Sequence, residues 1–150
     1  MGERSPHNDP NVRGAFLGLG LDTTRAQMAE AVFEGVSFAL KDSMEIARSL
    51  GIDITKTKLC GGGAKSPVWQ QILANILNLE VELLEAEEGP ALGGAILAAV
   101  ACGEYPTVEA AAKAIVKVKA TVVPQKEIAE AYAKKYEVFR SLYPAIKGKL

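Results

Sequence analysis

The sequence predicts an α/β fold in which strands alternate with packed helices, because short apolar runs alternate with stretches of helical periodicity. Apolar runs at 14–19 and 57–60 indicate buried strands, and each leads through a turn into a helix. The run at 79–84 alternates aliphatic residues with glutamates, which is typical of a strand with one wetter face near the edge of a sheet. These are three strands, whereas a usual sheet has about five or six. We therefore expect residues 1–150 to be a single domain that is incomplete at its N-terminus.

The first part of the chain predicts a loop, a strand and a long helix. Residues 1–13 are polar and rich in Pro and Asn, as in an unanchored loop. Thr24 and Gln27 have the spacing of a capping box, and Gly51 is placed to end the helix. The expected buried face consists of Met28, Val32, Val36, Leu40, Ala47 and Leu50.

The second part alternates further helices with extended segments. A helix from Pro67 should end near Asn78, and an acidic loop at 85–88 precedes a small-residue helix at 91–101. Thr107 predicts the cap of a helix to about Lys117, followed by an extended or irregular segment at 118–123. After Pro124, an aromatic stripe indicates the core face of a last helix: Ile128, Tyr132, Tyr136, Phe139 and Tyr143.

Composition excludes several classes of protein. The net charge of −1 and the pI near 5.9 argue against nucleic acid or a membrane surface as partner. The longest apolar stretch, 95–102, is too short to span a bilayer, and the polar N-terminus predicts no secretory signal. Cys60 and Cys102 lie in apolar surroundings without a CxxC pattern, which predicts buried free thiols rather than a disulfide or a metal site. We expect a cytoplasmic protein.

Three consecutive glycines, Gly61, Gly62 and Gly63, stand between a strand and a helix. Ser66 is a good N-cap, and Pro67 suits the first helical position. A strand, a glycine turn and a helix N-terminus together offer bare backbone N–H groups and a positive dipole end to a ligand. The spacing is neither Gly-x-Gly-x-x-Gly nor a Walker A loop, so a tight turn that binds nothing remains an alternative.

Four stretches together resemble the FGGY family of sugar kinases, and within it the xylulokinase branch. Gly14-x-Phe16-x-Gly18-Leu19 with 27–35 is similar to the C-terminal signature of the family, and 61–71 resembles its adenosine-binding turn. Residues 88–95 resemble its small-residue helix, with Gly-Gly-Ala in place of Gly-Ala-Ala. The run Gly2–Pro6, continued by Asp9-Pro10 and Arg13-Gly14, is similar to the xylulokinase branch.

The resemblance implies a part of an actin-like, RNase H-like ATPase domain, namely the ATP-side part of the second of two halves. The complete enzyme would transfer the γ-phosphoryl group of ATP to the terminal hydroxyl of a ketopentose, D-xylulose. The sugar contacts and the aspartate that acts as general base belong to the other half. Asp9, Asp22, Asp42 and Asp53 fall in loops, in a turn or on a helix surface, so we expect no catalytic residue in this chain and no xylulokinase activity from it alone.

The resemblance also implies the nucleotide-binding residues Gly61, Gly62, Gly63, Ala64 and Ser66, with the helix at 91–101 as a wall of the pocket. Ser66 would contact adenine or ribose, or it only caps its helix. Lys65 would meet a phosphate, or it is an ordinary exposed lysine. The small residues at 91–101 suit close helix packing as well as a ligand wall. Mg²⁺ would be bound through the phosphates, and the chain itself has no predicted metal ligand.

A second hypothesis is a non-catalytic nucleotide-binding or oligomerising module on the same scaffold. ATP or ADP is the expected ligand, and binding of either would separate a nucleotide-binding chain from a purely structural one. A homo-oligomer is expected because missing strands would leave apolar faces uncovered. Only the first expects turnover of a sugar when the other half is supplied.

Overall fold

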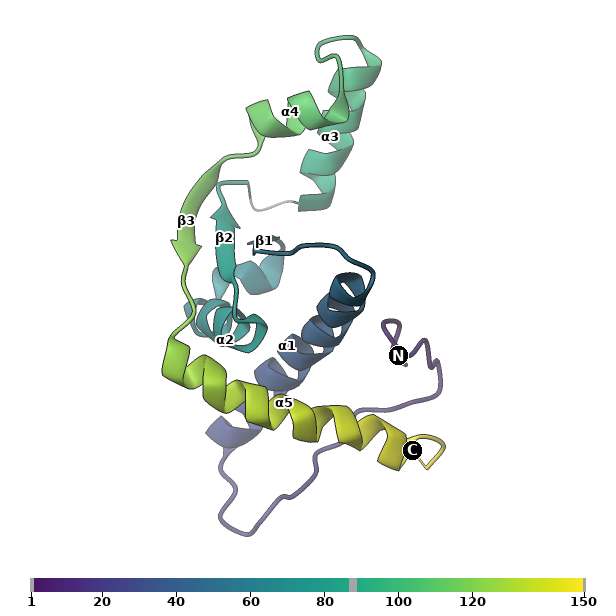
Figure 1. Cartoon of the computed structure of the whole chain (residues 1–150), viewed down its shortest axis with the longest axis vertical. Helices are drawn as coiled ribbons and strands as arrows, with labels where there is room; N and C mark the ends of the chain where they lie inside the picture. Colours follow the sequence, from purple (N-terminus) through teal and green to yellow (C-terminus); the bar gives the residue numbers. More distant parts are fainter. Residues whose placement is uncertain (1, 87–88, 150) are drawn as a thin grey trace. The chain divides into compact units, whose positions relative to one another are not determined.

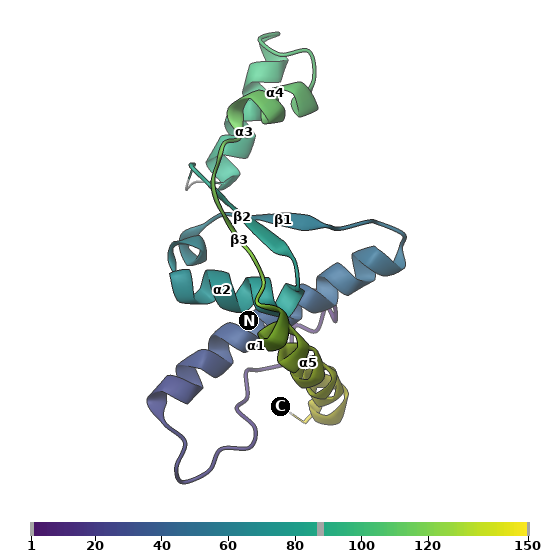
Figure 2. The same cartoon turned by 60° about the vertical axis from the view of Figure 1, so that its left-hand side comes forward.

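The computed structural model describes residues 2–86 and 89–149, which form helices α1 to α5, one 3-10 helix and strands β1 to β3 (Figures 1 and 2). The chain divides into two compact units. The first comprises Met1–Ile54, Asn75–Asn78 and Pro124–Leu150, and the second comprises Thr55–Ala74 and Leu79–Val123. The single domain over residues 1–150 stays a prediction. Within the described residues, no helix is both long and apolar enough to cross a membrane.

Helix α1 (Arg25–Ser49) in the first unit begins and ends as predicted. The Gln27 backbone N–H donates to Thr24 Oγ1 (3.3 Å), and the Thr24 N–H donates to Gln27 Oε1 (2.8 Å), which is a complete capping box. Gly51 follows the helix with a φ of +84°, and its N–H donates to the Arg48 carbonyl (2.9 Å). Local signals at both ends therefore set the length of this helix.

Aromatic rings join α1 to α5 (Lys126–Ile146). The Phe38 ring centroid lies 6.0 Å from that of Tyr132, 5.9 Å from that of Tyr136 and 5.2 Å from that of Phe139. Tyr132 and Tyr136 are only 8% and 5% exposed. The prediction that the stripe on the last helix is core is confirmed for these two residues, whereas Ile128 at its start is 43% exposed.

The predicted buried face of α1 is wrong. Val32, Val36 and Leu40 are 44–51% exposed, whereas Ser37, Phe38 and Met44 are buried. Helix α5 supplies large rings and covers the side that bears Phe38. Because α1 carries apolar residues on more than one side, periodicity alone does not choose between them.

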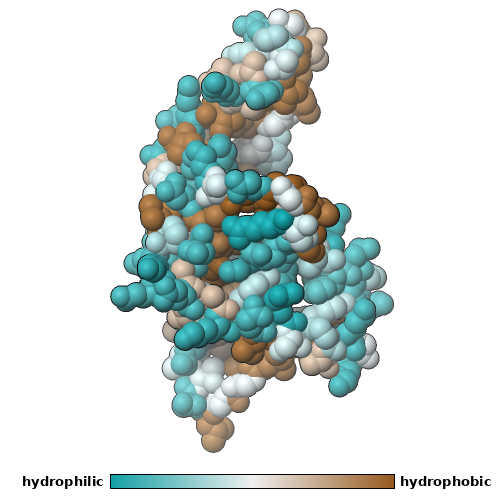
Figure 3. Space-filling view, viewed as in Figure 1, coloured by the Kyte–Doolittle hydropathy of each residue, from teal (hydrophilic) through white to brown (hydrophobic). Residues whose placement is uncertain are grey.

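The predicted strand at 14–19 is also wrong, since these residues have no regular secondary structure. Gly18 has a φ of +76°, which interrupts an extended run. Phe16, Leu17 and Leu19 are 46–54% exposed, and no described strand pairs with them. In Figure 3, brown apolar surface lies at the lower end, where this part of the chain runs in Figure 1.

The N-terminal segment is a loop, as expected, but it is anchored. Glu3 and Asp9 exchange two backbone hydrogen bonds of 2.8 Å each. The Tyr143 hydroxyl donates to Asp9 Oδ2 (2.9 Å), and the His7 ring stacks on Tyr143 at a centroid distance of 3.7 Å. The Asn11 N–H and the Tyr143 hydroxyl hold the pKa of Asp9 below its usual value. Side-chain contacts that composition does not reveal thus tie this loop to α5.

The second unit contains a three-stranded mixed sheet in the order β1-β2-β3. Strand β1 (Lys56–Leu59) runs parallel to β2 (Glu80–Leu84), and β3 (Val118–Val122) is antiparallel to β2. Helix α2 (Pro67–Leu77) forms the crossover between the parallel strands, as such a connection requires. The core cluster of the sheet consists of Ala74, Val81 and Leu83, with Leu59 and Val122 packed against it.

The predicted positions of the strands are wrong, although the α/β class is confirmed. Strand β2 lies in the centre of the sheet rather than near its edge, and Glu82 is tolerated there because Lys56 and Lys58 pair with it. Strand β1 is an edge strand, half-exposed rather than buried. The segment expected to be extended or irregular at 118–123 contains the other edge strand, β3.

Two further helices, α3 (Gly89–Ala101) and α4 (Val108–Ile115), pack against each other in this unit. The Thr107 hydroxyl accepts from the Ala110 N–H (3.1 Å), which confirms the predicted cap, and α4 ends two residues before Lys117. Cys60 and Cys102 are free, as predicted, but both are exposed, because they follow β1 and α3 at points open to solvent. The expected acidic loop at 85–88 lies partly outside the described residues.

Candidate functional site

The glycine turn joins β1 to α2 through a short 3-10 helix, Gly62–Lys65, rather than leading into α2 at once. Gly61 precedes it with a φ of +89°, a conformation that favours glycine. The Ala64 N–H donates to the Gly61 carbonyl (3.0 Å), and the Ser66 N–H donates to the Gly63 carbonyl (3.1 Å). These two N–H groups are therefore used inside the turn, and Ala64 does not present its own to a ligand.

The three glycines have three different environments. Gly61 provides the left-handed backbone. A Cβ atom on Gly63 would lie 1.7 Å from Cζ3 of Trp69, so this glycine makes room for the indole ring. Cβ atoms on Gly61 and on Gly62 would each meet nothing within 4 Å. Of these two glycines Gly62 is the exposed one, and its backbone is open to a ligand.

Ser66 and Gln70 hold the turn in place. Ser66 Oγ accepts from the Trp69 N–H (3.3 Å), so the predicted N-cap is present. Gln70 Nε2 donates to the Ala64 carbonyl (2.5 Å) and ties the turn to the first part of α2. Sequence reasoning missed Gln70, because a glutamine early in a helix is usually a surface residue and nothing in its spacing indicates a partner.

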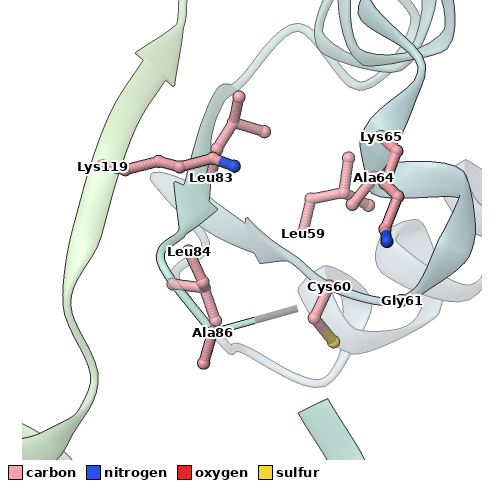
Figure 4. A pocket seen from close by; sticks show the side chains of 9 residues that line it. All are labelled: Leu59, Cys60, Gly61, Ala64, Lys65, Leu83, Leu84, Ala86 and Lys119. Carbon is pink, nitrogen blue, oxygen red and sulfur yellow. The ribbon is translucent and has the colours of Figure 1, made fainter. Parts of the chain in front are cut away.

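A small pocket lies beside the turn, at the carboxyl ends of β1 and β2 (Figure 4). Its lining consists of Leu59, Cys60, Gly61, Ala64, Lys65, Leu83, Leu84, Ala86 and Lys119. Its interior volume of about 20 Å³ is enough for about one water molecule. A nucleotide does not fit inside, so a ligand of the turn would lie on the open side of Gly62.

The start of α3 closes against the end of β1. A Cβ atom on Gly89 would lie 2.6 Å from Cys60 Sγ, which explains the absence of a side chain there. Further along α3, Cβ atoms on Gly93 and Gly94 would meet nothing within 4 Å. Within the described residues, close helix packing does not account for these two small residues.

Replacement of Gly63 by alanine is expected to destabilise the protein by about 1–3 kcal/mol, because the new methyl group overlaps the Trp69 ring. Thermal unfolding measures the loss, and the fluorescence of Trp69, the only tryptophan, reports the displaced ring. The matched control is Gly93→Ala, which has open space and improves helix propensity. Equal melting temperatures for Gly63→Ala and the wild type would contradict the described packing of Trp69.

The sequence matches the description "FGGY family of carbohydrate kinases, C-terminal domain" over residues 1–102. The chain belongs to this family. The xylulose kinase of Staphylococcus epidermidis is 40% identical over 146 residues, which are 97% of this chain and 29% of that protein. This FGGY chain therefore spans less than a third of the length of the curated relatives that it matches.

Solved structures of sugar kinases are also similar to this chain over nearly its whole length. The ligand-bound xylulose kinase of Lactobacillus acidophilus superposes with a TM-score of 0.86 at 26% identity, over 97% of this chain and 29% of that chain. A gluconate kinase of the same species gives a TM-score of 0.85, also at 26% identity and with the same coverage. The predicted class, a part of an actin-like ATPase domain, is confirmed for this FGGY chain.

Proposed function

We propose that the chain is the ATP-side part of a xylulokinase-like sugar kinase that transfers the γ-phosphoryl group of ATP to D-xylulose. Membership of the FGGY family and the likeness to xylulose kinases support the reaction class. The observation that carries the nucleotide assignment is the open backbone at Gly62, directly before the N-terminus of α2. The choice of D-xylulose rests on the sequence relatives, since the xylulose and gluconate kinase structures fit this chain equally well.

The turn suits the adenosine side of ATP. Glycine lets a flat ring approach the main chain, and the 11-residue helix α2 directs its positive dipole end toward the turn. In this proposal Gly61, Gly62, Gly63 and Ala64 form the contact surface, and the open face of α3 around Gly94 forms a wall. Phosphoryl transfer depends mainly on positioning and charge stabilisation, and this chain contributes positioning.

Two polar side chains have a smaller part in the proposal. Ser66 is already the cap of α2, so a contact with adenine or ribose would add to that role. Lys65 lies at the pocket and is exposed, where it could meet a phosphate. Within the described residues, no three His, Cys, Asp or Glu side chains gather as metal ligands, and the proposal gives Mg²⁺ a place only on the phosphates.

Titration of the chain with ADP tests the proposal, with calorimetry and the fluorescence of Trp69 as readouts. We expect weak binding, with a dissociation constant of about 0.1–1 mM, because the phosphate contacts belong to the rest of the enzyme. No binding at millimolar ADP would reject the nucleotide site. Binding without sugar phosphorylation, even after the remainder of a related kinase is added, would favour the alternative, a non-catalytic nucleotide-binding or oligomerising module.

Self-association as a two-fold dimer is a separate expectation, based on the uncovered face of α1. Val32, Val36 and Leu40 are spaced four residues apart and are 44–51% exposed, which is unusual for a helix of a monomer. A second copy of the chain would shield this face. Sedimentation at micromolar concentration should show a dimer, and Val36→Glu should shift it to monomer. Val138→Glu, at a site on α5 that is 62% exposed, is the matched control. A wild-type monomer with cooperative unfolding would contradict the expectation.

A further inference from the structure

Two adjacent glutamines near the start of α2 hold different parts of the second unit. Gln70 Nε2 donates to the Ala64 carbonyl of the 3-10 turn (2.5 Å). Gln71 Nε2 donates to the Val123 carbonyl (3.1 Å), directly after β3. Because β3 is antiparallel to β2, Val123 lies at the opposite end of the sheet from the turn. Neighbouring residues of one type thus make the same kind of bond at two separate places.

The Ala64 carbonyl needs a donor from outside the 3-10 helix. In such a helix each carbonyl accepts from the N–H three residues later. The carbonyls of Gly61 and Gly63 follow this rule and accept from Ala64 (3.0 Å) and Ser66 (3.1 Å). For the Ala64 carbonyl the third residue along is Pro67, which has no N–H. Ser66 is extended (φ −89°, ψ 108°), so the 3-10 ladder ends there.

Gln70 supplies the donor that Pro67 lacks. Proline suits the first position of α2, because an N–H there would have no partner within the helix. It also leaves the carbonyl of the preceding turn without its ladder donor. The side-chain amide of Gln70 replaces that donor, and it comes from a residue only six positions from Ala64. No other part of the protein is needed to form this bond.

The bond from Gln70 controls the peptide group that holds Gly62. The Ala64 carbonyl and the Lys65 N–H belong to one rigid peptide group. The ladder of the 3-10 helix Gly62–Lys65 pairs this N–H with the Gly62 carbonyl. If the Ala64 carbonyl loses its donor, it can rotate toward water, and the Lys65 N–H then turns away from Gly62. One side-chain bond therefore stabilises the backbone of the exposed glycine.

We propose that Gln70 is a positioning residue, which holds the peptide group between Ala64 and Lys65 and so fixes the backbone of Gly62 for its ligand. The ligand is the adenosine part of a nucleotide, and in this respect the inference rests on the proposed function. Gln70 acts through the Ala64 carbonyl, and its side-chain N–H is the group that matters.

The test replaces Gln70 by methionine, which keeps the length of the side chain and its helix propensity but has no N–H donor. The matched control is Gln71→Met, which removes the bond to the Val123 carbonyl on the same helix. ADP affinity, thermal unfolding and amide hydrogen exchange without nucleotide are measured on the full chain.

We expect Gln70→Met to bind ADP about tenfold more weakly than the wild type, as the loss of one hydrogen bond at the turn predicts. Exchange of the Lys65 N–H should become about tenfold faster, whereas exchange of Val81 in the core should not change. The two variants should unfold at similar temperatures. Gln71→Met should keep wild-type ADP affinity and wild-type exchange at Lys65, which a merely structural role of both glutamines would not produce.

The inference is overturned if either ADP affinity or Lys65 exchange in Gln70→Met matches the wild type, or if Gln71→Met loses as much affinity. If Gln70→Met does not fold, Gln70→Ala replaces it, with Gln71→Ala as its control and the same criteria. The exchange measurement does not depend on a nucleotide. If the wild type binds no ADP, the proposed function fails, and wild-type exchange at Lys65 in the Gln70 variant would separately overturn the role of this residue in the turn.

Discussion

Replacement of Gly62 by valine will abolish ADP binding while the chain stays folded. A Cβ atom at Gly62 meets no other atom within 4 Å, and its backbone is not among the left-handed glycines, so valine adopts the local conformation without a clash. The added isopropyl group occupies the space through which a nucleotide would approach the turn. Calorimetric titration should lose the ADP signal, and circular dichroism should show an unchanged melting temperature.

Two variants serve as controls for this result. Gly14→Val also has open space and an ordinary backbone conformation, and it should bind ADP like the wild type. Gly61→Val should lose stability as well as binding, because Gly61 has a φ of +89°. If Gly62→Val binds ADP with wild-type affinity, the nucleotide site lies elsewhere on the chain.

Local signals in the sequence predict the ends of the elements well. Thr24, Gly51 and Thr107 begin or end helices as expected, because capping depends on residues that are close together in the chain. Asn78 ends α2 with a φ of +51° for the same reason. These contacts need no knowledge of the rest of the fold.

The sequence fails where a long-range partner decides. Strand β2 reads as an edge strand because of Glu82, and only the pairing of that glutamate with Lys56 and Lys58 reveals a central strand. Similarly, the exposed apolar face of α1 cannot be told from its buried face until α5 is placed against Phe38. Alternation and periodicity describe one element at a time, whereas burial depends on two.

The sequence predicts the place of the glycine turn between a strand and a helix, but not the different environments of its three glycines. Three adjacent glycines look equivalent in the sequence, and the contact between Gly63 and Trp69 separates a packing role from the open position at Gly62. The cap at Ser66 could be predicted because it is local. The bond from Gln70 to the Ala64 carbonyl could not, since it depends on the shape of the 3-10 turn.

The isolated chain is expected to show no phosphorylation of D-xylulose, the prediction with the largest effect. An aspartate that acts as general base must lie within hydrogen-bond reach of the substrate proton that it accepts. Asp9 accepts the Asn11 N–H and the Tyr143 hydroxyl, and Asp42, predicted on a helix surface, is half-buried and accepts the Tyr136 hydroxyl (2.6 Å). Both carboxylates therefore serve packing. Asp22 and Asp53 are exposed and lie outside the helices and strands.

Loss of substrate positioning alone costs about 7–11 kcal/mol of the barrier, which is many orders of magnitude in rate. The measurement is ADP release from ATP with and without D-xylulose, with a full-length xylulose kinase from Staphylococcus epidermidis as positive control. We expect the same background rate with and without the sugar, at any concentration of this chain. Sugar-dependent ADP release that co-purifies with the chain and disappears in Gly62→Val would contradict the prediction, because it would show that these residues alone bind both substrates and supply the base.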